Sequence, residues 1–160
     1  MRLLRVLPIL FCLHLVFFRL SAQKDTMQKD TVQKGLVLLE AAKNGDSTKV
    51  RELIGTGVSP EVEYSNGETA LILAAKNGYL VIVKDLVEKG ANVNVKSYYG
   101  YTAPMYMADL GSLKLLKLMV EHGANLNSDA GKLLVIAARK NHLLIMNYLL
   151  EEKNFEEFKG

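Results

Sequence analysis

The chain has 160 residues and a formal net charge of +3, and 49% of its residues are hydrophobic. This size is sufficient for one domain with a substantial core. The first 22 residues contain three arginines and no acidic residue, so residues 23–160 carry 17 basic and 17 acidic side chains. Nucleic acid is usually bound by clustered Lys and Arg, so this balance argues against a nucleic-acid partner.

Residues 1–22 have the pattern of a secretory signal peptide. Two arginines lie in the first five residues, residues 6–18 are uncharged and rich in Leu, Ile, Val and Phe, and the polar sequence begins after Ala22. This order predicts cleavage after Ala22 and a periplasmic or secreted mature chain that makes no contact with a membrane. Cys12 is the only cysteine and leaves with the leader.

Two alternatives to a cleaved signal peptide stay open. An uncleaved membrane anchor is less favoured, because the apolar run over residues 6–18 is shorter than the roughly 20 residues that span a bilayer. A lipoprotein is also less favoured, because Phe11 is large for the residue before a lipidated cysteine. All three readings predict an exported domain.

Residues 23–33 form a polar segment in which five residues nearly repeat, first as QKDTM and then as QKDTV. The segment has few apolar side chains to bury. We therefore predict an exposed spacer between the cleavage site and the folded domain. A short helix that extends the domain is the alternative.

The sequence AAKNG occurs twice, at residues 41–45 and 74–78, which are 33 residues apart. At this period four copies align, at about residues 34–66, 67–99, 100–130 and 131–154. The fourth copy lacks three residues after Asn127. Periods of 20 to 50 residues indicate stacked arrays of small structural units.

Each copy predicts two short helices, as the second copy illustrates. Thr69 can cap a helix over residues 70–76, and Gly78 can end that helix in a left-handed conformation. A second helix over residues 80–88 has one apolar face, which consists of Val83, Leu86 and Val87. Helices of about nine residues are marginal in water, so the copies must stack to be stable, and the paired alanines allow close approach.

The chain resembles the ankyrin-repeat family. The second copy keeps G-x-T at 67–69, the alanine pair at 74–75, I-V-x-x-L-V at 82–87 and G-A-N-V-N at 90–94, but it departs from the family's T-P-L-H stretch. The resemblance covers about residues 34–153. It implies an all-α ankyrin-repeat solenoid of about four helix-turn-helix repeats with short hairpin fingers, over residues 34–154.

The sequence contains no recognisable catalytic arrangement. His122 and His142 lie beside turns where the family commonly has histidine, no serine lies in a G-x-S-x-G turn, and each glycine is explained by a repeat turn. We therefore expect no catalytic residue, cofactor or metal ion, and a chain that is not an enzyme. An enzyme with an unrecognised site is the least favoured alternative.

The resemblance implies that the chain binds another protein through its finger tips and the exposed, concave side of its first helices. The chain is expected to be a monomer, and an accessory or inhibitory subunit of a periplasmic enzyme is one alternative role. Tyrosines are favoured at binding hot spots, although tyrosines of neighbouring fingers can also pack on each other. The predicted protein-binding residues are Tyr64, Asn66, Glu68, Lys76, Asn77, Tyr98, Tyr99, Tyr101, Asp109 and Leu110.

The C-terminal end of the chain predicts two further features. The segment NSDAG at residues 127–131 leaves little room for a finger in the fourth copy, so the row of fingers is expected to end near the third. Residues 155–160 form a tail, and we predict that Phe155 and Phe158 help it to cover the last helix, because end repeats need a polar outer face.

Overall fold

The computed structural model of the chain describes residues 29–151. The predicted signal peptide, part of the predicted spacer and the tail over residues 155–160 therefore lie outside the described residues. The chain divides into two compact units, residues 1–34 and 35–160. In the first unit, residues 29–33 of the predicted spacer are helical with exposed side chains.

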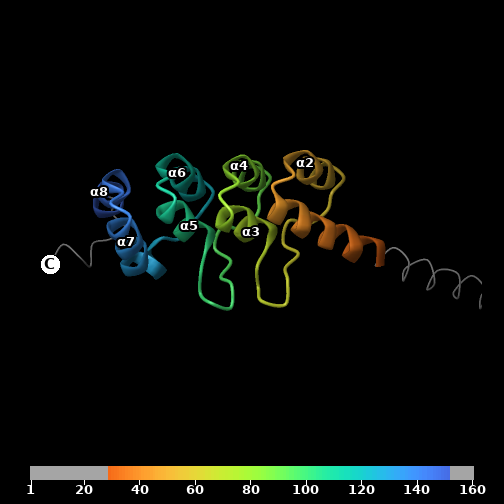
Figure 1. Cartoon of the computed structure of the whole chain (residues 1–160), viewed down its shortest axis with the longest axis horizontal. Helices are drawn as coiled ribbons and strands as arrows, with labels where there is room; N and C mark the ends of the chain where they lie inside the picture. The colour runs from red at the N-terminus through yellow and green to blue at the C-terminus, as the bar shows by residue number, and fades with distance from the viewer. Residues whose placement is uncertain (1–28, 152–160) are drawn as a thin grey trace, which may run out of the picture. The chain divides into compact units, whose positions relative to one another are not determined.

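The second unit contains helices in antiparallel pairs, which confirms the predicted all-α repeat architecture (Figure 1). No helix in residues 29–151 is long and apolar enough to cross a membrane. The pairs are residues 35–44 of the helix over 29–44 with α2 (Ser47–Gly55), α3 (Ala70–Lys76) with α4 (Leu80–Glu88), α5 (Ala103–Asp109) with α6 (Leu113–Glu121), and α7 (Ala130–Arg139) with α8 (Leu143–Glu151).

Successive pairs stack in register within this unit. The first helices α3, α5 and α7 contact one another in order, and the second helices α2, α4 and α6 do the same. Figure 1 shows α2, α4, α6 and α8 in one layer and α3, α5 and α7 in the other. One continuous cluster of buried apolar side chains runs from Leu38 to Leu149 through all the pairs.

The local signals in the sequence act as predicted. The Oγ1 atom of Thr69 accepts a hydrogen bond from the Ile72 amide at 3.4 Å, at the start of α3. Gly78 ends that helix with a φ of 76°, and Asn141 takes the equivalent place before α8 with a φ of 57°. Asparagine is one of the few other residues that adopt this left-handed conformation readily. Val83, Leu86 and Val87 of α4 are fully buried.

The repeated alanine pair lies where neighbouring first helices touch. Ala74, Ala75 and Ala108 have no exposed surface. Small side chains at these positions let the backbones of α3 and α5 approach closely, so that larger apolar residues around them are covered by both repeats. AAKNG therefore recurs because each repeat needs one close-packing step followed by one helix stop.

Polar side chains and backbone amides also link successive repeats. The Asn94 side chain accepts from the Asn125 amide at 2.8 Å and donates to the Gly123 carbonyl at 2.9 Å. One repeat earlier, Glu61 accepts from the Asn92 amide at 2.9 Å. Because Glu61 and Asn92 lie 33 residues before Asn94 and Asn125, the same side-chain link occurs at both junctions.

Two long loops project from the helices as fingers, and we name residues 58–69 finger 1 and residues 91–102 finger 2 (Figure 1). The amide of Tyr98 in finger 2 donates to the Asn66 carbonyl in finger 1 at 3.0 Å. The connection between α6 and α7 is instead a single 3₁₀ turn, Asn127–Asp129, which leads directly into α7. The fourth repeat thus lacks a finger, as predicted.

We expect Ala75→Leu to destabilise the fold by about 1–3 kcal/mol, because the added atoms have no space between α3 and its neighbours. Urea denaturation of residues 23–160 would measure the loss. The control is Lys114→Leu, which places the same side chain on the exposed surface of α6 and should change the unfolding free energy little. Equal stability of Ala75→Leu and the parent would contradict this packing.

Candidate protein-binding surface

Tyr98 and Tyr99 form the tip of finger 2, and each is 77% exposed. The backbone beneath them is held in place, because the Tyr98 amide is bonded to finger 1 and Gly100 donates to the Ser97 carbonyl at 2.8 Å. The Tyr98 ring also lies over Gly67, where an added β-carbon would come within 3.1 Å of it. Two aromatic side chains are therefore presented to solvent on an ordered loop.

Tyr101 lies at the base of the same finger and packs on a residue outside the predicted set. Its ring stacks on that of Tyr106 in α5, with centroids 5.6 Å apart and planes 28° apart. Burial raises the pKa of Tyr106 above its ordinary value. Tyr106 precedes Asp109 by three residues, so helical spacing alone could have placed both on one face of α5.

Tyr64 is a packed residue, unlike the tyrosines at the tip of finger 2. Its hydroxyl donates to a carboxylate oxygen of Glu40 at 2.6 Å, which joins finger 1 to the first helix. The pKa of Tyr64 is raised to about 12, mainly by burial and further by the hydrogen bond to Glu40 and the charge of that carboxylate. Ser97, the equivalent residue of finger 2, is also buried. This position of the finger therefore serves packing in both repeats.

Asn66, Glu68 and Lys76 form one network between finger 1 and the end of α3. The buried Glu68 carboxylate accepts from Lys76 Nζ at 2.7 Å and from the Asn66 side-chain amide at 2.9 Å. Burial raises the pKa of Glu68, but the hydrogen bonds from Lys76 and Asn66 outweigh it and leave the pKa below its ordinary value. The hydrogen bond to Glu68 raises the pKa of Lys76.

Asn77 connects the first and second repeats at the same, C-terminal end of α3, where it is the C-cap. Its side-chain amide donates to the Lys43 carbonyl at 3.3 Å and to the Leu73 carbonyl at 2.9 Å. A shallow pocket of about 280 Å³ lies between these groups and finger 1. It is lined by Lys43, Tyr64, Glu68, Leu73, Lys76 and Asn77, four of which were predicted to bind a partner.

Asp109 and Leu110 lie where α5 ends. The Asp109 carboxylate pairs with Lys140 at 3.4 Å, and its carbonyl accepts from Nε2 of His142 at 3.0 Å. The His142 ring lies against Gly111, which accounts for this histidine as a contact between repeats. The Leu110 side chain is exposed beside Gly78. Residues 29–151 contain no group of three or more side chains placed to hold a metal ion.

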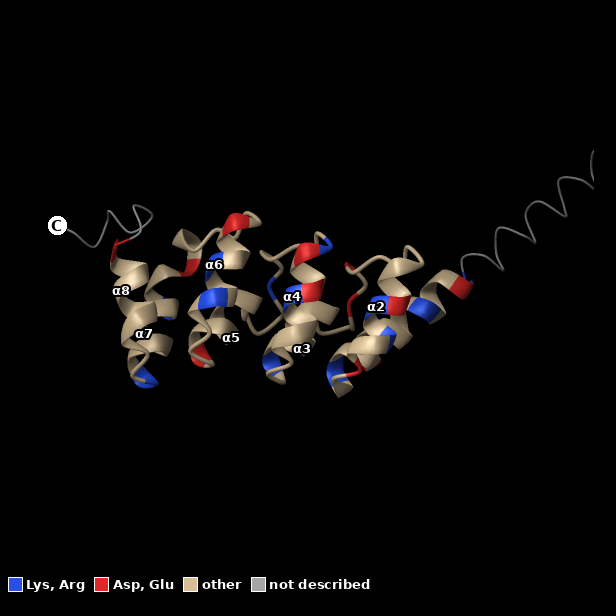
Figure 2. Ribbon diagram, turned by 90° about the horizontal axis from the view of Figure 1, so that it is seen from above, with Lys and Arg blue, Asp and Glu red and all other residues tan. Residues whose placement is uncertain are grey.

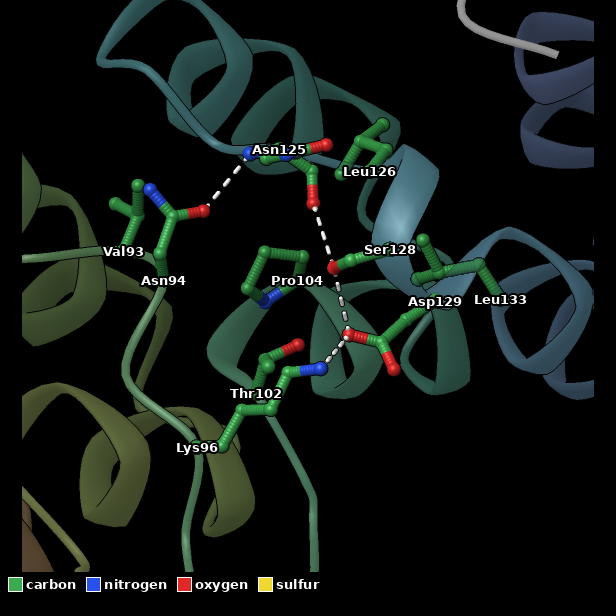
Figure 3. Close-up of a pocket in the computed structure, with 10 residues that line it drawn as sticks. All are labelled: Val93, Asn94, Lys96, Thr102, Pro104, Asn125, Leu126, Ser128, Asp129 and Leu133. Atoms are coloured by element: carbon green, nitrogen blue, oxygen red, sulfur yellow. Dashed lines mark hydrogen bonds and ion pairs between the residues drawn. The ribbon is translucent and has the colours of Figure 1, made fainter.

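A second pocket, of about 240 Å³, lies where finger 2 meets the 3₁₀ turn Asn127–Asp129 between α6 and α7 (Figure 3). Lys96 reaches from the finger to a carboxylate oxygen of the buried Asp129 at 2.7 Å, and Ser128 donates to the same carboxylate at 3.1 Å. Burial raises the pKa of Asp129, but the hydrogen bonds from Lys96 and Ser128 and the nearby lysine charges together outweigh it and leave the pKa below its ordinary value. Because Lys96 and Ser128 both bond to Asp129, these contacts hold finger 2 against the turn that leads into α7.

The ten predicted residues thus divide into three groups. Tyr64, Glu68, Lys76 and Asn77 line the first pocket, and Asn66 bonds to Glu68 beside it. Tyr98 and Tyr99 are exposed at the tip of finger 2, with Tyr101 below them, while Asp109 and Leu110 lie at the end of α5. Figure 2 shows basic and acidic residues mixed along the described stack.

We expect Tyr64 to ionise at about pH 12, against an ordinary value of 10.0. Because the folded-state pKa is the higher one, the neutral hydroxyl stabilises the fold below pH 10, and this contribution is lost as the pH rises toward about 12. Between about pH 9 and about pH 11, the unfolding free energy measured by denaturation should fall more for the parent than for Tyr64→Phe. Tyr99→Phe is the control, and its unfolding free energy should fall as much as that of the parent.

The comparisons with known proteins agree with this geometry. A family model described as ankyrin repeats (3 copies) matches residues 12–97 and 38–130. No curated protein matches the chain. Ankyrin repeats generally act as protein–protein interaction modules and are typically not enzymes. Because the matches together cover residues 12–130, well over half of the chain, and include the stacked pairs up to α6, the chain belongs to the ankyrin-repeat family.

Proposed function

We propose that the mature chain is an exported, non-enzymatic protein that binds one partner protein through the tip of finger 2 and the neighbouring side chains of Lys76 and Asp109 at the ends of α3 and α5. The observation that carries the proposal is the pair Tyr98 and Tyr99, each 77% exposed on a loop whose backbone is hydrogen-bonded to its neighbour. The pattern of residues 1–22 supports export.

The two tyrosines suit an interface for energetic reasons. Each can bury a large area on binding while losing the freedom of only two side-chain torsions, and each hydroxyl can bond a partner atom. The finger backbone is already ordered by its bond to Asn66, so binding does not have to order the loop. Large aromatic surface on a fixed loop therefore gives affinity at low entropic cost.

The surroundings of the tip supply a polar rim. The Lys76 side chain is half exposed although it pairs with Glu68, and Asp109 is likewise exposed although it pairs with Lys140. Such pairs hold their charged groups in fixed positions at the surface. A partner with complementary charges can be selected by these groups, whereas the apolar contact of Tyr98 and Tyr99 supplies most of the binding energy.

The test uses residues 23–160 as bait for proteins of the periplasm and the culture medium of the source cells, followed by titration with the purified partner. Tyr98→Ala/Tyr99→Ala should weaken binding about tenfold or more with an unchanged melting temperature. Leu143→Ala/Leu144→Ala removes two exposed apolar side chains of α8 and should bind normally.

Equal binding of the double tyrosine variant would contradict the proposed surface. Turnover of a substrate by the purified mature chain, lost on a single substitution, would contradict the non-enzymatic role. If the captured partner is itself an enzyme, its rate with and without the bound chain distinguishes an inhibitory or stabilising subunit from a simple tether.

A further inference from the structure

The outer side of the fourth repeat has the composition of an internal interface but is open in the described structure. Val135 of α7 is 58% exposed, whereas its equivalents in the two preceding repeats, Met105 and Ile72, are 2% and 1% exposed. The three-residue deletion makes Val135 equivalent to Met105, since Asn141 and Gly111 align as helix stops. Val135 is thus an apolar residue at a position that is buried in the two preceding repeats but that no described segment covers here.

The same contrast holds for the second residue of the alanine pair and for α8. Ala138 is exposed, while Ala108 and Ala75 at the same place are fully buried by the next repeat. On α8, Met146 is partly buried and Leu150 is exposed. Leu134 of α7 is also only partly buried. We name Leu134, Val135, Ala138, Met146 and Leu150 together the end face.

The nine residues that follow α8 match this face in chemistry and reach. They read EKNFEEFKG and contain two large apolar side chains, Phe155 and Phe158. An extended segment of this length spans about 30 Å, and two packed helices are together about 20 Å wide. The segment can therefore cross α8 and α7 from its starting point beside Leu150.

Charge complementarity favours this segment over other occupants. Residues 151–160 contain four glutamates and two lysines. Arg139 and Lys140 are exposed at the C-terminal end of α7, beside the end face, although Lys140 also pairs with Asp109 of the preceding repeat. Lys132 lies on the other side, where it pairs with Asp129 near finger 2. A second copy that stacked its own end face here would instead bring Arg139 and Lys140 close to their equivalents.

We propose that residues 152–160 fold back across the end face, with Phe155 and Phe158 packed on Val135 and Ala138, in the place that a neighbouring repeat takes at the internal junctions. The tail glutamates then lie outward, near the cations of α7. The segment closes the stack and leaves finger 2 free, so this role is independent of the proposed partner binding.

The first test compares residues 23–160 with Phe155→Ala/Phe158→Ala by hydrogen–deuterium exchange. Losing the cap should raise the exchange of α7 and α8 amides about tenfold, and that of α3 and α4 much less, because an uncovered end repeat opens first. Lys153→Ala/Lys159→Ala changes the same segment without removing apolar surface and should leave exchange as in the parent. Partner capture should be equal for all three proteins.

The second test does not depend on stability. The mature chain has no cysteine, so Ala138→Cys with Glu157→Cys creates one possible disulfide, and oxidation should close it within one chain. Glu157→Cys with Ser65→Cys on finger 1 should stay open. Unchanged exchange in the phenylalanine variant would overturn the proposal, as would an open Ala138→Cys pair or a dimer, measured by light scattering, that Val135→Glu dissolves.

Discussion

Close contact between first helices at the alanine pairs is the constraint on which the rest of the structure depends. α3 and α5 have seven residues each, too few to be stable alone in water. They persist because Ala74, Ala75 and Ala108 let successive backbones approach until the larger side chains around them are covered on both sides. A single well-packed repeat would not suffice, because the burial is shared between neighbours.

The regular spacing set by this contact also determines which polar groups of successive repeats meet. The links from Glu61 to Asn92 and from Asn94 to Asn125 form because each repeat places the same side chain beside the same amide of the next. The two fingers follow the same spacing, so the Tyr98 amide lies within hydrogen-bonding distance of the Asn66 carbonyl. The exposed tip of finger 2 is therefore positioned by the spacing of the helices.

The period of 33 and the local signals were sufficient to predict the helices, their stops and the missing fourth finger, since each depends on a few adjacent residues. They could not separate Tyr64 from Tyr98 and Tyr99. Both kinds of tyrosine lie near a finger tip, but the partner of Tyr64 is Glu40, 24 residues away. Likewise, the link between His142 and the Asp109 carbonyl depends on how two repeats stack, which no local pattern contains.

The contact between His142 and Gly111 has a consequence for how this sequence can change. The imidazole occupies the space that a β-carbon at residue 111 would need, at 2.6 Å, and the φ of Gly111 is 73°. Relaxing the backbone would not by itself admit a side chain at 111 while the ring stays. The two positions are therefore expected to evolve as a unit, with substitutions at one tolerated only on particular backgrounds at the other.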